Sequence, residues 1–248
     1  IQVFCQIEET ETHTELYGGK PELKGLKRLE EGRDMDEWYL REWAGVDPAN
    51  GSPLWYTTDE NGKRTTTNSY NKADRVYCGS AAPKFTGGWM NSFSYKGFTL
   101  TANFDFVYGN LLYNQSRELL DSDGAYADYN SMKLKSGWKR WEKEGDIATH
   151  PKAINGGNKN SNKSSSRYLE KGNYFSLRNL SLGYSIPEKL CGKLGLQRVN
   201  VSCSADNLFT LTPFSGVSPQ LSDSSTDGYA GTIYPLSRRI VLGLNVSF

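Results

Sequence analysis

The chain ends in a run of alternating residues that strongly limits how this segment can fold. Over the last nine residues every second position is apolar, namely Ile240, Leu242, Leu244, Val246 and Phe248. The residues between them are mostly small or polar, so the segment predicts a β-strand with one apolar and one hydrated face. No polar tail follows Phe248, whereas soluble domains commonly end in a frayed segment.

Composition narrows the classes of protein to which such a strand can belong. The 248 residues carry a formal net charge of +1, which excludes the basic field of a nucleic-acid-binding protein. No run approaches the roughly 18 apolar residues of a membrane-spanning helix. This does not exclude a β-barrel, because apolar and polar residues alternate in barrel strands and their mean hydropathy resembles that of a soluble protein. The 15 Tyr, 10 Phe and 6 Trp suit two classes, an outer-membrane β-barrel and a soluble β-sandwich with aromatic pockets.

Further alternating segments predict an antiparallel all-β fold. The clearest runs from Phe98 to Tyr108, with apolar residues at the even positions. Just before it, a second strand has its large apolar residues at odd positions, namely Phe85, Trp89, Phe93 and Tyr95. The two are joined at Tyr95–Gly97, where glycine allows a tight hairpin. We expect other strands at 1–9, 37–46, 53–58, 174–186 and around 199–205, with Pro187 ending the fourth of these.

The connections between these strands alternate in length. Short turns are expected at 47–51, 95–97 and 187–195, and long polar loops at 59–82, 110–167 and 212–235. In an up-and-down sheet, alternate connections emerge at the same end. All short turns would therefore lie at one end and all long loops at the other, as in outer-membrane barrels with periplasmic turns and extracellular loops.

Residues that could bind a ligand or carry catalysis are few. Trp138 and Trp141 in the longest loop could stack on sugar rings, or they could pin the loop onto its neighbours. His13 and His150 have no second ligand at metal spacing, so no metal or cofactor is expected. No nucleophile or nucleotide motif is present. The chain is therefore expected not to be an enzyme, although a glycan-cleaving enzyme stays a third hypothesis because the spacing of its carboxylates is spatial.

The four cysteines and the start of the chain carry little information. Cys5, Cys78, Cys191 and Cys203 are widely spaced without a C-x-x-C pair, so a disulfide framework is not expected and no role is assigned to them. The first residues from Ile1 lack the features of a signal peptide. We therefore expect the chain to be a fragment of a longer precursor, for a reason that the sequence does not give.

Several short motifs, in order, resemble those of one family. Gly45–Gly51 is similar to its G-V-D-P-x-T-G turn, and Pro83–Gly88 with Phe93–Phe98 to its P-K-x-T-G-G and F-x-Y-K-G-F hairpin. Tyr168–Tyr184 resembles its Y-L-E-K-G-x-Y-x-R-L-R-N-x-x-L-G-Y stretch, and Asp206–Thr212 contains its N-L-F-T-L-T segment. Jointly they resemble the carboxy-terminal third or less of SusC/RagA-type TonB-dependent outer-membrane transporters, from about residue 30 to Phe248.

The resemblance implies a transmembrane barrel of about 22 strands with an internal plug. Residues 1–248 would be the carboxy-terminal part of that domain, about 7 or 8 strands, without the plug. The implied partners are the remaining barrel and plug, TonB, a SusD-like surface lipoprotein, outer-membrane lipid and an oligosaccharide or peptide substrate, in the Gram-negative outer membrane.

Within that expectation each strand has a lipid and a lumen side. The lumen-facing candidates are Thr99, Thr101, Asn103, Asp105 and Asn245, and Phe248 would be the signal that the barrel-assembly machinery recognises. An interfacial aromatic anchor is a compatible role for Phe248. The lipid-facing candidates are Phe98, Leu100, Phe104, Phe106, Leu242, Leu244, Val246 and Phe248. The alternative is a soluble carbohydrate-binding β-sandwich that uses the loop tryptophans.

Overall fold

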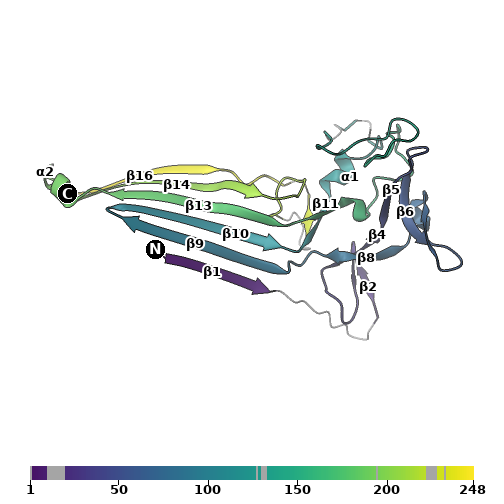
Figure 1. Ribbon diagram of the computed structural model, residues 1–248, viewed down its shortest axis with the longest axis horizontal. Coiled ribbons are helices and arrows are strands. Elements are labelled where there is room, and N and C mark those ends of the chain that lie inside the picture. Colours follow the sequence, from purple (N-terminus) through teal and green to yellow (C-terminus); the bar gives the residue numbers. More distant parts are fainter. Residues whose placement is uncertain are drawn as a thin grey trace.

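The computed structural model of the chain shows a long sheet joined at one end to a region built from loops (Figure 1). It describes residues 2–9, 20–126, 128–129, 133–193, 195–221, 228–231 and 233–248, with the backbone alone for 2–9.

The long sheet has six strands, all antiparallel to their neighbours, in the order β1-β9-β10-β13-β14-β16. Apart from β1, they run nine to fourteen residues. Their bounds are β1 Gln2–Glu9, β9 Phe85–Tyr95, β10 Phe98–Tyr108, β13 Tyr174–Ser185, β14 Arg198–Leu211 and β16 Arg239–Ser247. The all-β, antiparallel fold class is thereby confirmed. Within the described residues the sheet is open, with β1 and β16 as its outer strands.

The short connections of this sheet lie at one end, beside the carboxyl terminus (Figure 1). Between β9 and β10 the chain turns at Lys96 and Gly97, both with positive φ, which matches the right-handed twist of a hairpin. A Cβ at Gly97 would lie 2.7 Å from the Ser185 carbonyl oxygen, so this turn requires glycine. Helix α2, Glu188–Lys193, forms the other short connection.

The longer connections gather at the opposite end and contain their own strands. One sheet has the order β2-β3-β4-β8, one β5-β6-β7, and one β12-β11-β15. The strands are β2 Glu22–Lys24, β3 Lys27–Leu29, β4 Glu37–Arg41, β5 Trp43–Val46, β6 Pro53–Thr58, β7 Arg64–Thr67, β8 Arg75–Ser80, β11 Leu111–Asn114, β12 Leu169–Lys171 and β15 Tyr229–Ala230. Helix α1 spans Ser116–Leu120, and short 3₁₀ helices cover Tyr70–Lys72 and Ser166–Tyr168. We call this part the loop region.

The loop region also holds a buried apolar core. Trp38, Leu40, Tyr113 and Tyr168 are nearly inaccessible and pack together with Ala81. The Trp38 indole N–H donates to the Leu111 carbonyl oxygen at 2.9 Å, across 73 residues of sequence. Segments from distant parts of the chain therefore share one core there.

The structure corrects the position of one predicted hairpin. Residues 37–46 and 53–58 do form strands, and β5 pairs with β6 around the turn at 47–51. Both lie in the loop region and not in the long sheet (Figure 1), so the long sheet has six strands where about seven or eight were expected. The alternation was real, but strands of four to six residues fall short of the roughly nine needed to cross a bilayer.

Candidate functional site

One face of the long sheet is apolar from strand to strand. Residues paired in register point to the same side, so Leu100 of β10 lies between Phe93 of β9 and Leu182 of β13. The row continues through Cys203 to Leu242 of β16. The neighbouring row contains Tyr95, Phe98, Tyr184, Val201 and Leu244.

These side chains are exposed in the chain as it stands. Leu242 is 80% exposed, Leu244 69% and Phe98 51%. A continuous apolar surface of this extent on a folded protein marks a place that another apolar phase covers. The lipid-facing candidates of β10 and β16 thus share one face of the sheet.

Aromatic side chains lie toward both ends of this face. At the turn end Phe98 packs on Tyr184 with ring centroids 4.3 Å apart, and Tyr95 stands beside them in register. Phe85 stacks on Tyr108 at the loop end, at 6.4 Å. Phe248, 84% exposed, follows directly after β16. Rings at both borders of an apolar band are typical of strands that cross a membrane.

The opposite face of the sheet is polar. Thr99, Thr101, Asn103 and Asp105 alternate with the apolar residues of β10 and so share this face. Asp105 accepts hydrogen bonds from Tyr174 at 3.2 Å and from Arg178 at 3.0 Å. Asn245 of β16 is paired with Asn200 of β14. That this face lines a lumen stays a prediction.

A cluster of buried charges holds the longest loop. Asp123 accepts from Arg167 at 2.5 Å, from Arg140 at 2.7 Å and from Ser161 at 2.7 Å. Asp121 pairs with Arg117 at 3.1 Å and Arg167 at 3.3 Å and contacts His150 at 2.9 Å. We call Arg117, Asp121, Asp123, Arg140, His150 and Arg167 the ionic cluster.

The environment of this cluster favours the ionised form of the Asp121 carboxyl group. Burial alone would raise the pKa of Asp121, but the His150 hydrogen bond and the charges of Arg167 and Arg117 outweigh it and hold that pKa below its ordinary value. Burial would likewise lower the pKa of Arg167, and the nearby Tyr168, Asp123 and Asp121 instead raise it. Because these opposite charges pair within the longest loop, the cluster is suited to a structural role in ordering that loop.

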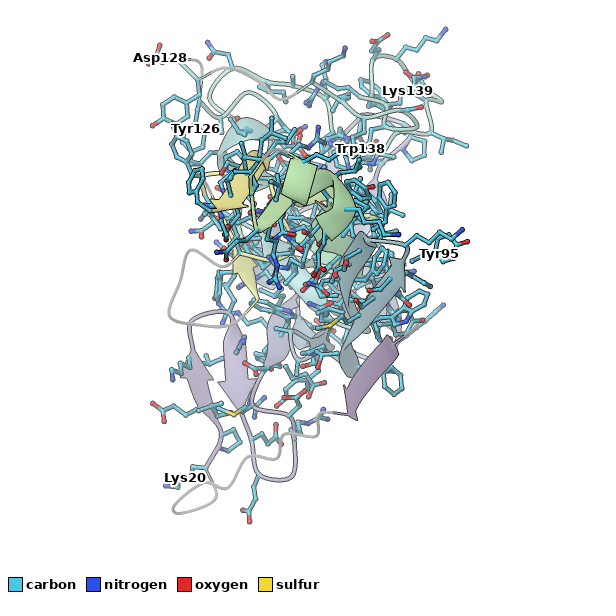
Figure 2. All side chains as sticks on the ribbon, turned by 90° about the vertical axis from the view of Figure 1, so that its left-hand side faces the viewer. Lys20, Tyr95, Tyr126, Asp128, Trp138 and Lys139 are labelled. Atoms are coloured by element: carbon cyan, nitrogen blue, oxygen red, sulfur yellow. The ribbon has the colours of Figure 1, made fainter. Side chains whose placement is uncertain are left out.

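The two loop tryptophans have different surroundings. Trp141 is 7% exposed and its indole N–H donates to the Pro48 carbonyl oxygen at 2.9 Å. Trp138 packs on His150 with ring centroids 5.0 Å apart, and Arg117 lies 4.5 Å from its ring. In Figure 2 Trp138 lies further in, while Tyr126 and Asp128 lie at the outer edge. This geometry supports the pinning interpretation for Trp141, and ligand contact by either ring stays a prediction.

The ionic cluster was not predicted from the sequence. His150 was considered only as a metal ligand, and the described residues contain no group of three or more His, Cys, Asp or Glu that could hold a metal ion. Arg167 lies 44 residues from Asp123 along the chain, so no local sequence spacing predicts that the two side chains pair. The closely spaced Asp121 and Asp123 were the only available signal.

Cys78, Cys191 and Cys203 are free thiols, and Cys203 sits on the apolar face as a small apolar residue. None of the helices in the described ranges is long and apolar enough to cross a membrane.

The sequence is similar to that of known proteins. No protein-family model matches the chain. It is 32% identical over 181 residues to TonB-dependent receptor P39 of Formosa agariphila, a match that covers 71% of this chain and 17% of the receptor. It is 29% identical over 246 residues to TonB-dependent receptor P3 of the same organism, covering 89% of this chain and 23% of that receptor. The chain thus spans less than a quarter of either curated relative.

Solved structures agree with these relatives. The structure of the RagAB peptide transporter matches with a TM-score of 0.81 at 25% identity, over 99% of this chain and 27% of that one. The RagAB peptide importer in its open-open state matches with a TM-score of 0.80, also at 25% identity, over 99% of this chain and 26% of that one. The resemblance that the motifs indicated is confirmed: the chain is a relative of TonB-dependent receptors, and its fold is similar to that of part of the RagAB peptide transporter.

Proposed function

We propose that this chain forms part of the wall of an outer-membrane TonB-dependent transporter that imports oligosaccharides or peptides. The observation that carries the proposal is the apolar face that runs unbroken from β9 to β16. In water this surface would be costly, at about 25 cal/mol per Å² of apolar area. In contact with lipid the same surface is matched to its surroundings.

The dimensions of the strands fit a bilayer. The eleven residues of β10, at about 3.4 Å each and tilted by about 45°, span about 26 Å, close to the apolar band of outer-membrane barrels. The aromatic pairs Phe98–Tyr184 and Phe85–Tyr108 would then lie at the two interfaces. The free edges of β1 and β16 would pair with further strands, because hydrocarbon does not tolerate unpaired backbone groups.

The proposal includes the partners of such a transporter. The remaining barrel and plug would complete the protein, TonB would energise it through the plug, and a SusD-like surface lipoprotein would cover the loop region. The solved relatives are complexes named RagAB, and the folded loop region offers a preformed surface for a lid. The relatives that the chain matches are named as receptors and transporters, which agrees with a protein that is not an enzyme.

Cell fractionation tests the proposal against the soluble alternative. We expect the full-length protein that contains this chain to sediment with Gram-negative outer membranes and to be released only by detergent. A carbohydrate-binding sandwich would instead stay folded and monomeric in detergent-free buffer. Recovery of the protein in the soluble fraction would contradict the proposal.

The terminal residue has its own test. Deleting Phe248 removes an exposed ring that we propose is recognised by the barrel-assembly machinery. We expect a several-fold lower outer-membrane level, measured by quantitative blotting, whereas Phe248→Tyr, which keeps an aromatic terminus, would assemble normally. Equal outer-membrane levels of the deletion variant and the parent protein would contradict the recognition role of Phe248.

A further inference from the structure

A groove on the apolar face lies near the turn end of the long sheet. This hollow, of about 390 Å³, is formed by residues of β10, β13, β14 and β16. Its volume falls within the range of small-molecule sites. We call it the β14 groove; its lining on this face includes Leu182, Tyr184, Val201, Cys203, Leu242 and Leu244.

Differences in side-chain size between paired strands produce the β14 groove. Val201 of β14 is paired with Tyr184 of β13 on one side and with Leu244 of β16 on the other. The next row repeats this pattern, with Cys203 between two leucines. The β14 side chains are smaller than their neighbours in both rows, so they form the floor of a groove that follows the strand between higher walls.

The floor of the groove is apolar. Ser202 also borders the hollow, but it alternates with Val201 and Cys203 and so points its hydroxyl toward the polar face. A narrow apolar groove that follows a membrane-crossing strand is matched in shape and polarity to a hydrocarbon chain, because lipid chains also run from the interface into the bilayer.

The groove ends at an aromatic and basic border beside the turn. Phe98 lines the groove and packs on Tyr184, with ring centroids 4.3 Å apart. Tyr95, the register partner of Phe98, is 71% exposed, and the Nζ of Lys96 lies 5.2 Å from the centroid of the Tyr95 ring. Lys96 therefore lies at the edge of the apolar band, where a long side chain can hold its charge at a membrane interface.

The turn end carries more positive than negative charge. Its basic side chains are Lys96, Lys189, Lys193 and Arg198, and its anions are Glu188 and the terminal carboxylate. All four basic side chains are exposed, and within the described residues none of them forms an ion pair with a carboxylate. Helix α2, which carries two of the lysines, contacts β14 (Figure 1). An anionic headgroup at this end would meet cations that no carboxylate neutralises.

We propose that the β14 groove and the basic turn end bind an anionic glycerophospholipid of the leaflet at the turn end. One acyl chain lies in the groove, and the headgroup phosphate lies near Lys96 and α2. The Tyr184 hydroxyl makes no hydrogen bond among the described residues, so it is a donor for the phosphate or ester oxygens. The inference rests on the proposed function, because only a barrel wall in a membrane presents this face to lipid. In outer-membrane barrels the short turns are periplasmic, so the lipid is a phospholipid and not lipopolysaccharide.

Native mass spectrometry of the full-length transporter, released from outer membranes in mild detergent, tests the groove by detecting lipid that stays bound. Cys203→Phe fills the floor of the groove with a ring. Ala205→Phe is the matched control, because Ala205 follows Cys203 on the same face of β14 and does not line the groove. We expect the parent protein and Ala205→Phe to retain phospholipid, and Cys203→Phe to retain several-fold less.

A competition between two headgroups tests the charge. The delipidated transporter receives phosphatidylglycerol and phosphatidylethanolamine with identical chains in equal amounts. The turn-end variant combines Lys96→Gln, Lys189→Gln and Lys193→Gln. The control makes the same charge change at exposed lysines of the loop region, with Lys20→Gln, Lys63→Gln and Lys72→Gln. We expect the parent and the control to prefer phosphatidylglycerol, and the turn-end variant to lose at least about fivefold of that preference.

The outcomes separate this site from the proposed function. A transporter that retains no phospholipid, retains lipopolysaccharide in its place, or retains lipid equally in Cys203→Phe and Ala205→Phe would overturn the inference. So would a parent protein without a headgroup preference, or a preference that the turn-end variant keeps. Should Cys203→Phe fail to assemble, the exposed lysine substitutions alone decide the outcome. Absence of the parent protein from the outer membrane would instead show that the proposed function has failed.

Discussion

At the scale of single residues, Asp123 shows what holds the loop region in place. Its two oxygens accept from Arg140, Arg167 and Ser161, and its side chain is fully buried. Asp123 and Asp121 together compensate the charges of both arginines. A buried ion pair is weak evidence for stability as a whole, but breaking one by removing a partner is costly.

We therefore expect Asp123→Asn to lower the free energy of local unfolding of the longest loop by about 3 kcal/mol or more, because the substitution leaves the Arg167 charge partly uncompensated. Glu42→Gln is the control, since it breaks an exposed pair with Arg64 and should cost less than about 1 kcal/mol. Hydrogen exchange of residues 110–126 in the assembled protein measures both. Equal exchange in the two variants would contradict the role of the cluster.

Two other carboxylates of the longest loop, Asp121 and Asp146, predict how its stability depends on pH. The native pKa of Asp121 is lowered, and that of Asp146 is lowered to about 2 by hydrogen bonds from Lys139 and from the backbone of Glu142 and Lys143. A lowered native pKa stabilises the fold above the unfolded value and loses that contribution as pH falls through the native value. Protease resistance of the loop should be constant from about pH 7 to 5 and fall below about pH 4. A loss of resistance between pH 7 and 5 would contradict this expectation.

At the scale of elements, the turn at 47–51 shows how a short segment is fixed by a distant one. Gly51 has a φ of +72°, and a Cβ there would lie 2.5 Å from the Trp141 ring. The Trp141 N–H in turn binds the Pro48 carbonyl oxygen. The turn and the longest loop therefore support each other.

Gly51→Ala is expected to destabilise this contact by about 2 kcal/mol or more, through backbone strain and overlap with Trp141. Gly62→Ala is the matched control, because Gly62 has a φ of +76° but no atom within 4 Å of its Cβ, so only the strain of about 1 kcal/mol remains. Exchange rates at residues 47–53 and 139–152 report the difference. If the two alanine variants behave alike, packing on Trp141 contributes nothing.

The elements also show what the sequence could predict. Strands β9, β10, β13, β14 and β16 were predictable because an amphipathic strand of nine or more residues repeats its pattern often enough to stand out. In the loop region the strands at 37–46 and 53–58 were predictable in the same way. The rest of that region was not, because its pairings join distant segments: β11 with β15, and Asp123 with Arg167. The polar face of β10 followed from alternation, whereas the pairing of Gly88 with Asp105 depends on the register between two strands.

At the scale of the whole molecule, the two faces of the long sheet set opposite demands. Leu182 and Ser181 are adjacent on β13, so they point to opposite sides. Leu182 is exposed on the apolar face. A membrane environment would penalise a charge at the first position and accept it at the second.

Leu182→Arg should therefore lower outer-membrane assembly, with a cost of about 2–4 kcal/mol if the site lies near the bilayer midplane. Ser181→Arg should assemble at close to the parental level. Heat-modifiable mobility on gels and outer-membrane yield measure assembly for both. A soluble sandwich would tolerate both arginines equally.

The shared construction of the loop region has a consequence for descent and for engineering. Strand β11 pairs with β15, which belongs to a different loop, and its Leu111 accepts from Trp38, which belongs to a third. A chimera that receives one of these loops from a relative would lose its pairing partners, while one that receives all three would keep them. Cargo preference in such transporters would then diverge by coordinated replacement of whole sets of loops, and recombination within a set would be selected against.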